Sequence, residues 1–185
     1  MAVWRGGFDE GFTKEEFFHY VQNIRWSWKP KFITVHNTSA PTQAQWKATR
    51  GGEAQRMRNL EDYYKNRQGW PSGPHLFIGE KIWKGTPLNV KGTHTPSWNN
   101  ISLGMEIAGE YDSDPFIDPY RGNAIHALAV LHYVLRLDPA DYQLGVKGLH
   151  FHKEDPRTSH KRCPGKNISK RDLIDSVKVA MKQWG

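Results

Sequence analysis

Phe32-Ile33-Thr34-Val35-His36 is a short run of aromatic and β-branched residues, and it leads into Asn37-Thr38-Ser39-Ala40-Pro41. Aromatic and β-branched residues favour strands, whereas Asn, Ser and Pro favour turns. The run therefore predicts a strand that ends at His36 and opens into a loop. Functional side chains commonly lie at such junctions, so His36 is the first candidate for a functional role.

The same kind of pattern outward from this strand predicts an alternation of strands and helices. Further strands are expected over residues 75–78, 101–107 and 146–151. Helices are expected over residues 13–24, 41–49, 52–66, 124–135 and 169–183, the first and last opened by capping boxes at Thr13 and Ser169. The segments 79–100 and 114–121 are expected to be mainly loop. The pattern predicts an α/β fold, with residues 1–185 forming a single domain.

The composition limits the class of protein. The 185 residues include a single cysteine, Cys163, which excludes an intramolecular disulfide framework. The net charge of +7 favours anionic partners such as an anionic cell wall, although the Lys and Arg residues are scattered along the chain. The sequence contains no apolar run of about 18 residues and begins without a signal-peptide pattern. We therefore expect synthesis in the cytoplasm and no membrane insertion.

Three segments concentrate residues that could carry chemistry. They are the strand end at His36, the segment Asn99–Glu106 with one carboxylate among apolar residues, and the segment from Leu149 to Gly165. A catalytic zinc needs three protein ligands, such as imidazoles and a thiolate, and Cys163 with histidines upstream can supply that kind of set. Glu106 and Lys161 are of suitable types to move a proton and to stabilise an oxyanion.

In this order, the segments resemble the zinc-dependent N-acetylmuramoyl-L-alanine amidases, which include phage lytic amidases, bacterial recycling amidases and peptidoglycan recognition proteins. The similarity extends from about residue 30 to 167. It implies the peptidoglycan recognition protein-like amidase fold, a single α/β domain with a central mixed β-sheet flanked by α-helices. His36 matches the first histidine ligand, at the end of a strand. Cys163-Pro164-Gly165 matches the last ligand, and Lys161 matches a catalytic lysine two positions before it.

The resemblance implies a metal site with Zn²⁺ bound by His36, His152 and Cys163. His152-Lys153-Glu154 fits the middle ligand best, although eleven positions separate His152 from Cys163, which is longer than usual for the family, and His150 is the alternative. Glu106 matches the catalytic glutamate of the recycling enzymes.

The resemblance also implies substrate contacts from His94 in Gly92-Thr93-His94, and from His75 and Asn100. One departure is the pair Pro74-His75, because many members of the family carry a catalytic tyrosine where Pro74 stands.

The function implied is hydrolysis of the amide bond between N-acetylmuramic acid and L-alanine in peptidoglycan, in a phage-type endolysin that reaches the wall after host lysis or holin-type release. The alternatives are a non-catalytic peptidoglycan-binding module and a cytoplasmic muropeptide-recycling amidase. A basic nucleic-acid-binding protein with structural zinc is disfavoured, because the sequence lacks a four-ligand Cys/His cluster and a basic aromatic stripe. We expect a monomer with a peptidoglycan or muropeptide substrate and no nucleic-acid partner.

Overall fold

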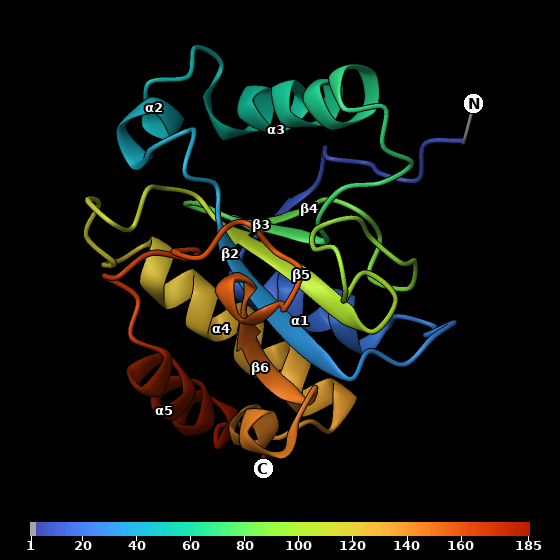
Figure 1. Cartoon of the computed structure of the whole chain (residues 1–185), viewed down its shortest axis with the longest axis vertical. Helices are drawn as coiled ribbons and strands as arrows, with labels where there is room; N and C mark the ends of the chain where they lie inside the picture. The colour runs from blue at the N-terminus through green and yellow to red at the C-terminus, as the bar shows by residue number, and fades with distance from the viewer. Residues whose placement is uncertain (1–2) are drawn as a thin grey trace.

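A computed structural model describes residues 3–185; Met1 and Ala2, the first residues of the segment in which no leader was expected, lie outside it. Among the described residues, six strands form one sheet in the order β1-β4-β3-β5-β2-β6 (Figure 1). Their bounds are β1 Gly11–Phe12, β2 Phe32–Asn37, β3 Leu76–Ile78, β4 Ile82–Lys84, β5 Ser102–Ile107 and β6 Gly148–Phe151.

The sheet is mixed, as the resemblance implies. Strands β3, β5, β2 and β6 run parallel to one another, whereas β4 and β1 are antiparallel to their neighbours. Because the parallel strands point the same way, the residues at their carboxyl ends meet at one edge of the sheet, where open α/β sheets usually bind ligands.

The two faces of the central strands differ in character because successive side chains in a strand point to opposite faces. On one face, His36 of β2 lies beside Glu106 of β5, and Thr34 lies beside Gly104. The residues between them form the apolar face and are almost fully buried: Ile33, Val35, Leu103, Met105, Ile107, Leu149 and Phe151. The apolar face forms the core, and the polar face is left for the site.

Three helices pack together on one side of the sheet (Figure 1). They are α1 (Lys14–Gln22), α4 (Tyr120–Leu135) and α5 (Lys170–Met181), and α4 lies between the other two. The Thr13 hydroxyl and the Glu16 carboxylate form the expected capping box at the start of α1. In residues 3–185, no helix has both the length and the apolar character that a membrane crossing requires.

The remaining helices are short or stand apart from this layer. Helix α2 (Gln43–Lys47) and helix α3 (Gly52–Asp62), which continues as the π-helical turn η1 (Tyr63–Arg67), lie above the sheet at the top of Figure 1. Two 3₁₀ turns, η2 (Pro139–Leu144) and η3 (His152–Glu154), flank β6.

A single carboxylate fastens α2 and α3 to the sheet. Glu53 of α3 accepts hydrogen bonds from the indole N–H of Trp46 in α2 and from that of Trp83 in β4, the latter at 2.8 Å. It also accepts from the backbone N–H groups of Glu80 and Lys81, at 2.7 and 3.2 Å, in the turn between β3 and β4. Helices α2 and α3 are therefore held in a fixed position over the sheet.

The structure differs from the expectations at three places. The segment 79–100 is mainly loop, as expected, but it also contains the unexpected strand β4, whose Ile82 and Trp83 are buried because β4 folds back on β3. No strand was expected at β1, which pairs with β4. Helix α4 begins at Tyr120 instead of near residue 124, because its first turn packs Tyr120 into the core.

Candidate active site

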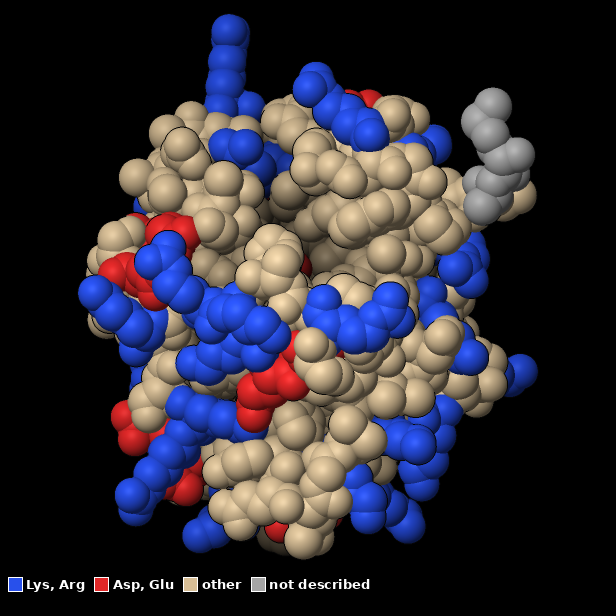
Figure 2. Space-filling view, in the orientation of Figure 1, with Lys and Arg blue, Asp and Glu red and all other residues tan. Residues whose placement is uncertain are grey.

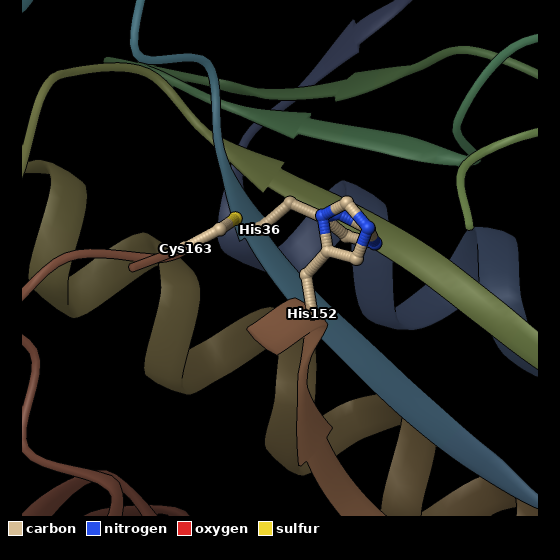
Figure 3. Close-up of side chains that lie close together, drawn as sticks. All are labelled: His36, His152 and Cys163. Atoms are coloured by element: carbon tan, nitrogen blue, oxygen red, sulfur yellow. The ribbon is translucent and has the colours of Figure 1, made fainter. Parts of the chain in front are cut away.

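Three residues that are far apart in the sequence converge at the carboxyl edge of the sheet (Figure 3). His36 comes from the end of β2, His152 follows β6 directly, and Cys163 comes from the loop after η3. One ligand atom of each residue lies within 4.8 Å of the others. The His36 and His152 ring centroids are 4.4 Å apart. This spacing is close enough for one metal ion to contact all three after small side-chain movements.

The protonation states of these groups suit a metal ion. Burial, with neighbouring histidines adding to it, lowers the pKa of His36 well below its usual value, and burial with His160 lowers the pKa of His152 to about 4. Both imidazoles are therefore neutral near pH 7 and carry a free lone pair. Burial raises the pKa of the Cys163 thiol, so its proton is lost only when a metal binds. Two neutral imidazoles and one thiol form a donor set that fits Zn²⁺.

Glu106 lies beside the cluster. It pairs with His36 in the register of β2 and β5, and its Oε1 is 3.8 Å from His36 Nδ1. Its side chain is about one-tenth exposed, and this burial raises the pKa of Glu106 to about 8. A carboxyl group with such a pKa can hold or release a proton near neutral pH.

The cluster forms the floor of a cavity of about 860 Å³, within the size range of ligand pockets (Figure 2). The opposite wall comes from α3, η1 and the residues that follow them. Its lining side chains include Leu60, Tyr63, Tyr64, Gln68 and Trp70. The cavity therefore has a polar floor with three residues that could hold a metal ion, and a wall rich in aromatic residues.

Lys161 lies at the rim of this cavity. It lines an adjoining hollow of about 330 Å³, and four residues line both spaces: Asn37, Ser39, His160 and Cys163. Lys161 is exposed, and its charge contributes to the low pKa of His152, after the larger effects of burial and His160. Its ammonium group is thus within electrostatic reach of the cluster.

The three expected substrate contacts occupy different environments. His94 lines the cavity, with its Nδ1 3.0 Å from His36 Nε2. His75 is fully buried, where its Nδ1 accepts from the Gly104 N–H at 2.9 Å and its Nε2 lies 3.0 Å from the Val90 carbonyl oxygen. Asn100 lies in an exposed turn. Of the three, only His94 is placed to touch a molecule in the cavity.

His150, the alternative middle ligand, has other partners. Its Nε2 donates to the Gly145 carbonyl at 3.0 Å, and its ring packs against Phe32 and Trp98. The structure thus brings His152, and not His150, to His36 and Cys163.

Several site residues were missed by sequence reasoning. Asn99, next to the expected Asn100, accepts hydrogen bonds from the backbone N–H groups of His94 and Thr95 at 2.8 and 2.9 Å. The hydroxyl of Thr158 lies 2.8 Å from His152 Nε2. Asn is common in turns because its side chain hydrogen-bonds to nearby backbone groups, so the sequence could have indicated the role of Asn99. The residues of the aromatic wall carry no sequence motif that would have indicated theirs.

Comparison with known proteins then identifies the family. The family model described as N-acetylmuramoyl-L-alanine amidase matches residues 27–166. The chain belongs to this amidase family. The match includes His36, His152 and Cys163, the three residues of the candidate metal site, and confirms the expected resemblance.

Two animal proteins illustrate the relatives of this amidase-family chain. Peptidoglycan-recognition protein 2 of Holotrichia diomphalia is 29% identical over 99 residues, which cover 51% of this chain and 50% of the relative. Peptidoglycan recognition protein 1 of Mus musculus is 39% identical over 61 residues, covering 31% of this chain and 34% of the relative. The matches thus span half or less of the length of these relatives.

Solved structures share the fold along most of the chain. A mutant of Drosophila PGRP-LB in complex with tracheal cytotoxin superposes with a TM-score of 0.60 at 18% identity, covering 91% of this chain and 84% of that one. The endolysin N-acetylmuramoyl-L-alanine amidase LysCS from Clostridium intestinale URNW gives a TM-score of 0.55 at 21% identity, covering 84% and 92%. The predicted fold, a mixed sheet flanked by helices, is therefore confirmed.

Proposed function

We propose that this amidase-family protein is a zinc-dependent enzyme that hydrolyses the amide bond between N-acetylmuramic acid and L-alanine in peptidoglycan. The observation that carries the proposal is the convergence of His36, His152 and Cys163 on the floor of a cavity that also exposes Glu106. A binding module needs a cavity, but it has no need for a metal donor set beside a carboxyl group of raised pKa.

His36, His152 and Cys163 would hold the ion. When bound, Zn²⁺ supplies a Lewis acid that polarises the scissile carbonyl and lowers the pKa of a water molecule. Glu106 would take a proton from the attacking water and deliver it to the leaving amine of L-alanine. Its place next to His36 and its raised pKa, to about 8, support this role in both directions of proton transfer.

Lys161 would stabilise the negative charge that develops on the carbonyl oxygen. Its place at the rim requires the long side chain to turn toward the cluster, a movement that an exposed lysine makes freely. Other exposed cations, Lys153, Arg157 and Arg162, belong to the same segment, which crosses the molecule below the hollow (Figures 1 and 2). Together with the net charge of +7, they favour a substrate with acidic stem peptides.

The biological setting belongs to the same proposal. We assign residues 1–185 to one amidase domain that acts as a monomer in a phage-type lytic enzyme and reaches the wall after host lysis or holin-type release. The structural similarity to an endolysin amidase supports this fold for such a task. His94 and the aromatic wall would contact the muropeptide, and Pro74, which stands where many family members have a tyrosine, leaves proton transfer to Glu106.

The test is digestion of purified peptidoglycan by the protein loaded with zinc. Free N-terminal alanine should appear without new reducing ends, and the metal content should approach one zinc per chain. Cys163→Ser should lose both zinc and activity, because the variant removes the thiolate ligand. Glu106→Gln, by contrast, should keep the zinc and lose activity.

The other outcomes separate the alternatives. New reducing ends would show a glycosidase and overturn the proposal. Wall binding without hydrolysis in the presence of zinc would favour the binding module, in line with the peptidoglycan-recognition proteins among the relatives. Cleavage of released muropeptides with intact wall left uncut would favour the recycling enzyme.

A further inference from the structure

A chain of hydrogen bonds runs from the metal-binding cluster into the sheet. His36 Nε2 lies 3.0 Å from His94 Nδ1, and His94 Nε2 lies 3.2 Å from the backbone carbonyl oxygen of Ser102. All three residues are buried. Each neutral imidazole carries one proton, so the chain can be resolved by asking which atoms are able to accept.

The backbone carbonyl of Ser102, at one end of this series of hydrogen bonds, determines which atoms donate and which accept. A carbonyl oxygen only accepts, so His94 Nε2 must carry the proton and donate it to Ser102. The Ser102 hydroxyl does not compete for this role, since it donates to the Trp98 carbonyl at 3.0 Å and accepts from the Thr34 hydroxyl at 3.0 Å. His94 Nδ1 is therefore unprotonated and acts as an acceptor.

The protonation of His94 then determines which nitrogen of His36 carries a proton. Because His94 Nδ1 accepts, His36 Nε2 must donate, and the lone pair of His36 is left on Nδ1. The reverse arrangement would set the lone pair of His94 Nε2 against the Ser102 oxygen, and it would leave a proton on His36 Nδ1 at 3.8 Å from Glu106, too far for a hydrogen bond. Burial lowers the pKa of His94 well below its usual value, in agreement with a neutral ring.

The sheet holds His94 in the required orientation. Asn99 bonds to its backbone N–H, and the ring lies directly over Gly104 of β5, where a Cβ would come within 2.3 Å of His94 Cγ. The ring can occupy this place only because residue 104 is glycine. A ring held by its neighbours in this way is able to impose a tautomer on His36.

We infer that His94 is a positioning residue that fixes the Nε2–H tautomer of His36, so that Nδ1 is the atom offered to the metal ion. This role rests on the metal centre of the proposed function and differs from the substrate contact expected for His94. It concerns the free protein and its affinity for zinc, so it can be tested without substrate or catalysis.

The first measurement is the tautomer of His36 in the metal-free protein labelled with ¹⁵N-histidine. Long-range ¹H–¹⁵N spectra should show a protonated Nε2 and an unprotonated Nδ1 for His36, and the same pattern for His94. A proton on His36 Nδ1 in the unaltered chain would overturn the inference, whatever the behaviour of any variant.

The second measurement is zinc affinity, by competition with a chromophoric chelator. His94→Leu removes the acceptor, so His36 should populate both tautomers and zinc affinity should fall about 10- to 100-fold. His94→Asn restores an acceptor oxygen near the position of Nδ1 and should recover much of the affinity and the single tautomer.

The matched control is His126→Leu. It removes an imidazole that is bonded to a backbone carbonyl, that of Lys14 at 2.8 Å, on the helical side of the molecule. This variant should leave the His36 tautomer and zinc affinity unchanged. A folded His94→Leu with the original His36 tautomer and zinc affinity would overturn the inference. Absence of amidase activity in the unaltered, zinc-loaded protein would count against the proposed function instead.

Discussion

Glu106 combines two properties that rarely occur together in a structural carboxyl group: it is buried, and it faces a cavity. The proposed proton transfer predicts that Glu106→Gln lowers kcat by roughly 10²- to 10⁴-fold, because general acid–base catalysis contributes about that much. Zinc content should be unchanged. Release of alanine N-termini and metal analysis of the same preparation measure both quantities.

Glu110→Gln provides the matched control, because Glu110 lines the adjoining hollow and not the floor of the main cavity. Its kcat should stay near that of the parent chain. Equal losses in the two variants would show that Glu106 acts through general electrostatics or folding.

Lys161 gives a second prediction at the residue level. Lys161→Met keeps the aliphatic stem and removes the charge, so kcat should fall about 10²-fold or more if the ammonium stabilises the oxyanion. Lys166→Met, at another exposed position in the same loop, is the control for loss of one positive charge. If both variants lose the same activity, and the loss vanishes at high salt, Lys161 serves only to attract the substrate.

The residues of the cluster could be predicted because each sits in a short, distinctive context: His36 at a strand end, and Cys163 before Pro-Gly. The chain of bonds through His94 could not. It depends on Ser102 and Gly104 of β5 lying opposite Phe32 and Thr34 of β2, a register set by tertiary pairing. The place of Tyr64 and Trp70 in the cavity wall could not be predicted either, because they line the cavity only when the segment that carries them lies over the sheet.

Among the secondary-structure elements, α3 is attached to the sheet through one side chain, that of Glu53. Glu53→Ala removes the acceptor for the indole N–H groups of Trp46 and Trp83 and for two backbone N–H groups. Buried donors without partners cost about 1–3 kcal/mol each, and water can reach some of these, so a loss of about 2–4 kcal/mol in the free energy of unfolding is expected. Urea titration measures it.

Glu53→Gln keeps one acceptor oxygen and should lose less stability than Glu53→Ala. The alanine variant should also raise KM more than it changes kcat, since α3 carries part of the cavity wall and none of the residues proposed to hold the metal ion. Equal stability of the three proteins would mean that hydrophobic packing alone positions α3.

Elements with a strong periodic pattern were predicted well, and those defined by pairing were not. The capping box of α1 and the strand at β2 follow from local sequence. Strand β4 is too short to show alternation, and its place among glycines and prolines resembles a loop until β3 is there to pair with it. Helix α4 begins earlier than expected, at Tyr120, because that ring is buried, and the sequence pattern does not indicate this burial.

For the molecule as a whole, buried neutral histidines make stability depend on pH. Burial lowers the pKa of His75 to about 4 and also lowers that of His132. The unfolded chain takes up protons near pH ~6.5 while the folded chain does not, so this stability is present above pH ~6.5 and is lost as the pH falls toward 4. We expect the metal-free protein to lose roughly 2 kcal/mol for His75 alone between pH 7 and 5.

Urea unfolding at both pH values checks this expectation. His75→Asn removes one titrating group, so its stability should depend less steeply on pH even if it is less stable throughout. An unchanged pH dependence in the variant would show that the unfolded chain does not take up the expected proton.

The missing Cβ at Gly104 has a consequence for how such chains can diverge. Any side chain at position 104 would collide with the imidazole of His94, so neither position can change alone without disturbing the other. Related sequences that keep the histidine should keep the glycine, and those that acquire a larger residue at 104 should have given up the histidine. The two positions should therefore covary, and the pair should mark which descendants of this fold still hold their first histidine ready for a metal ion.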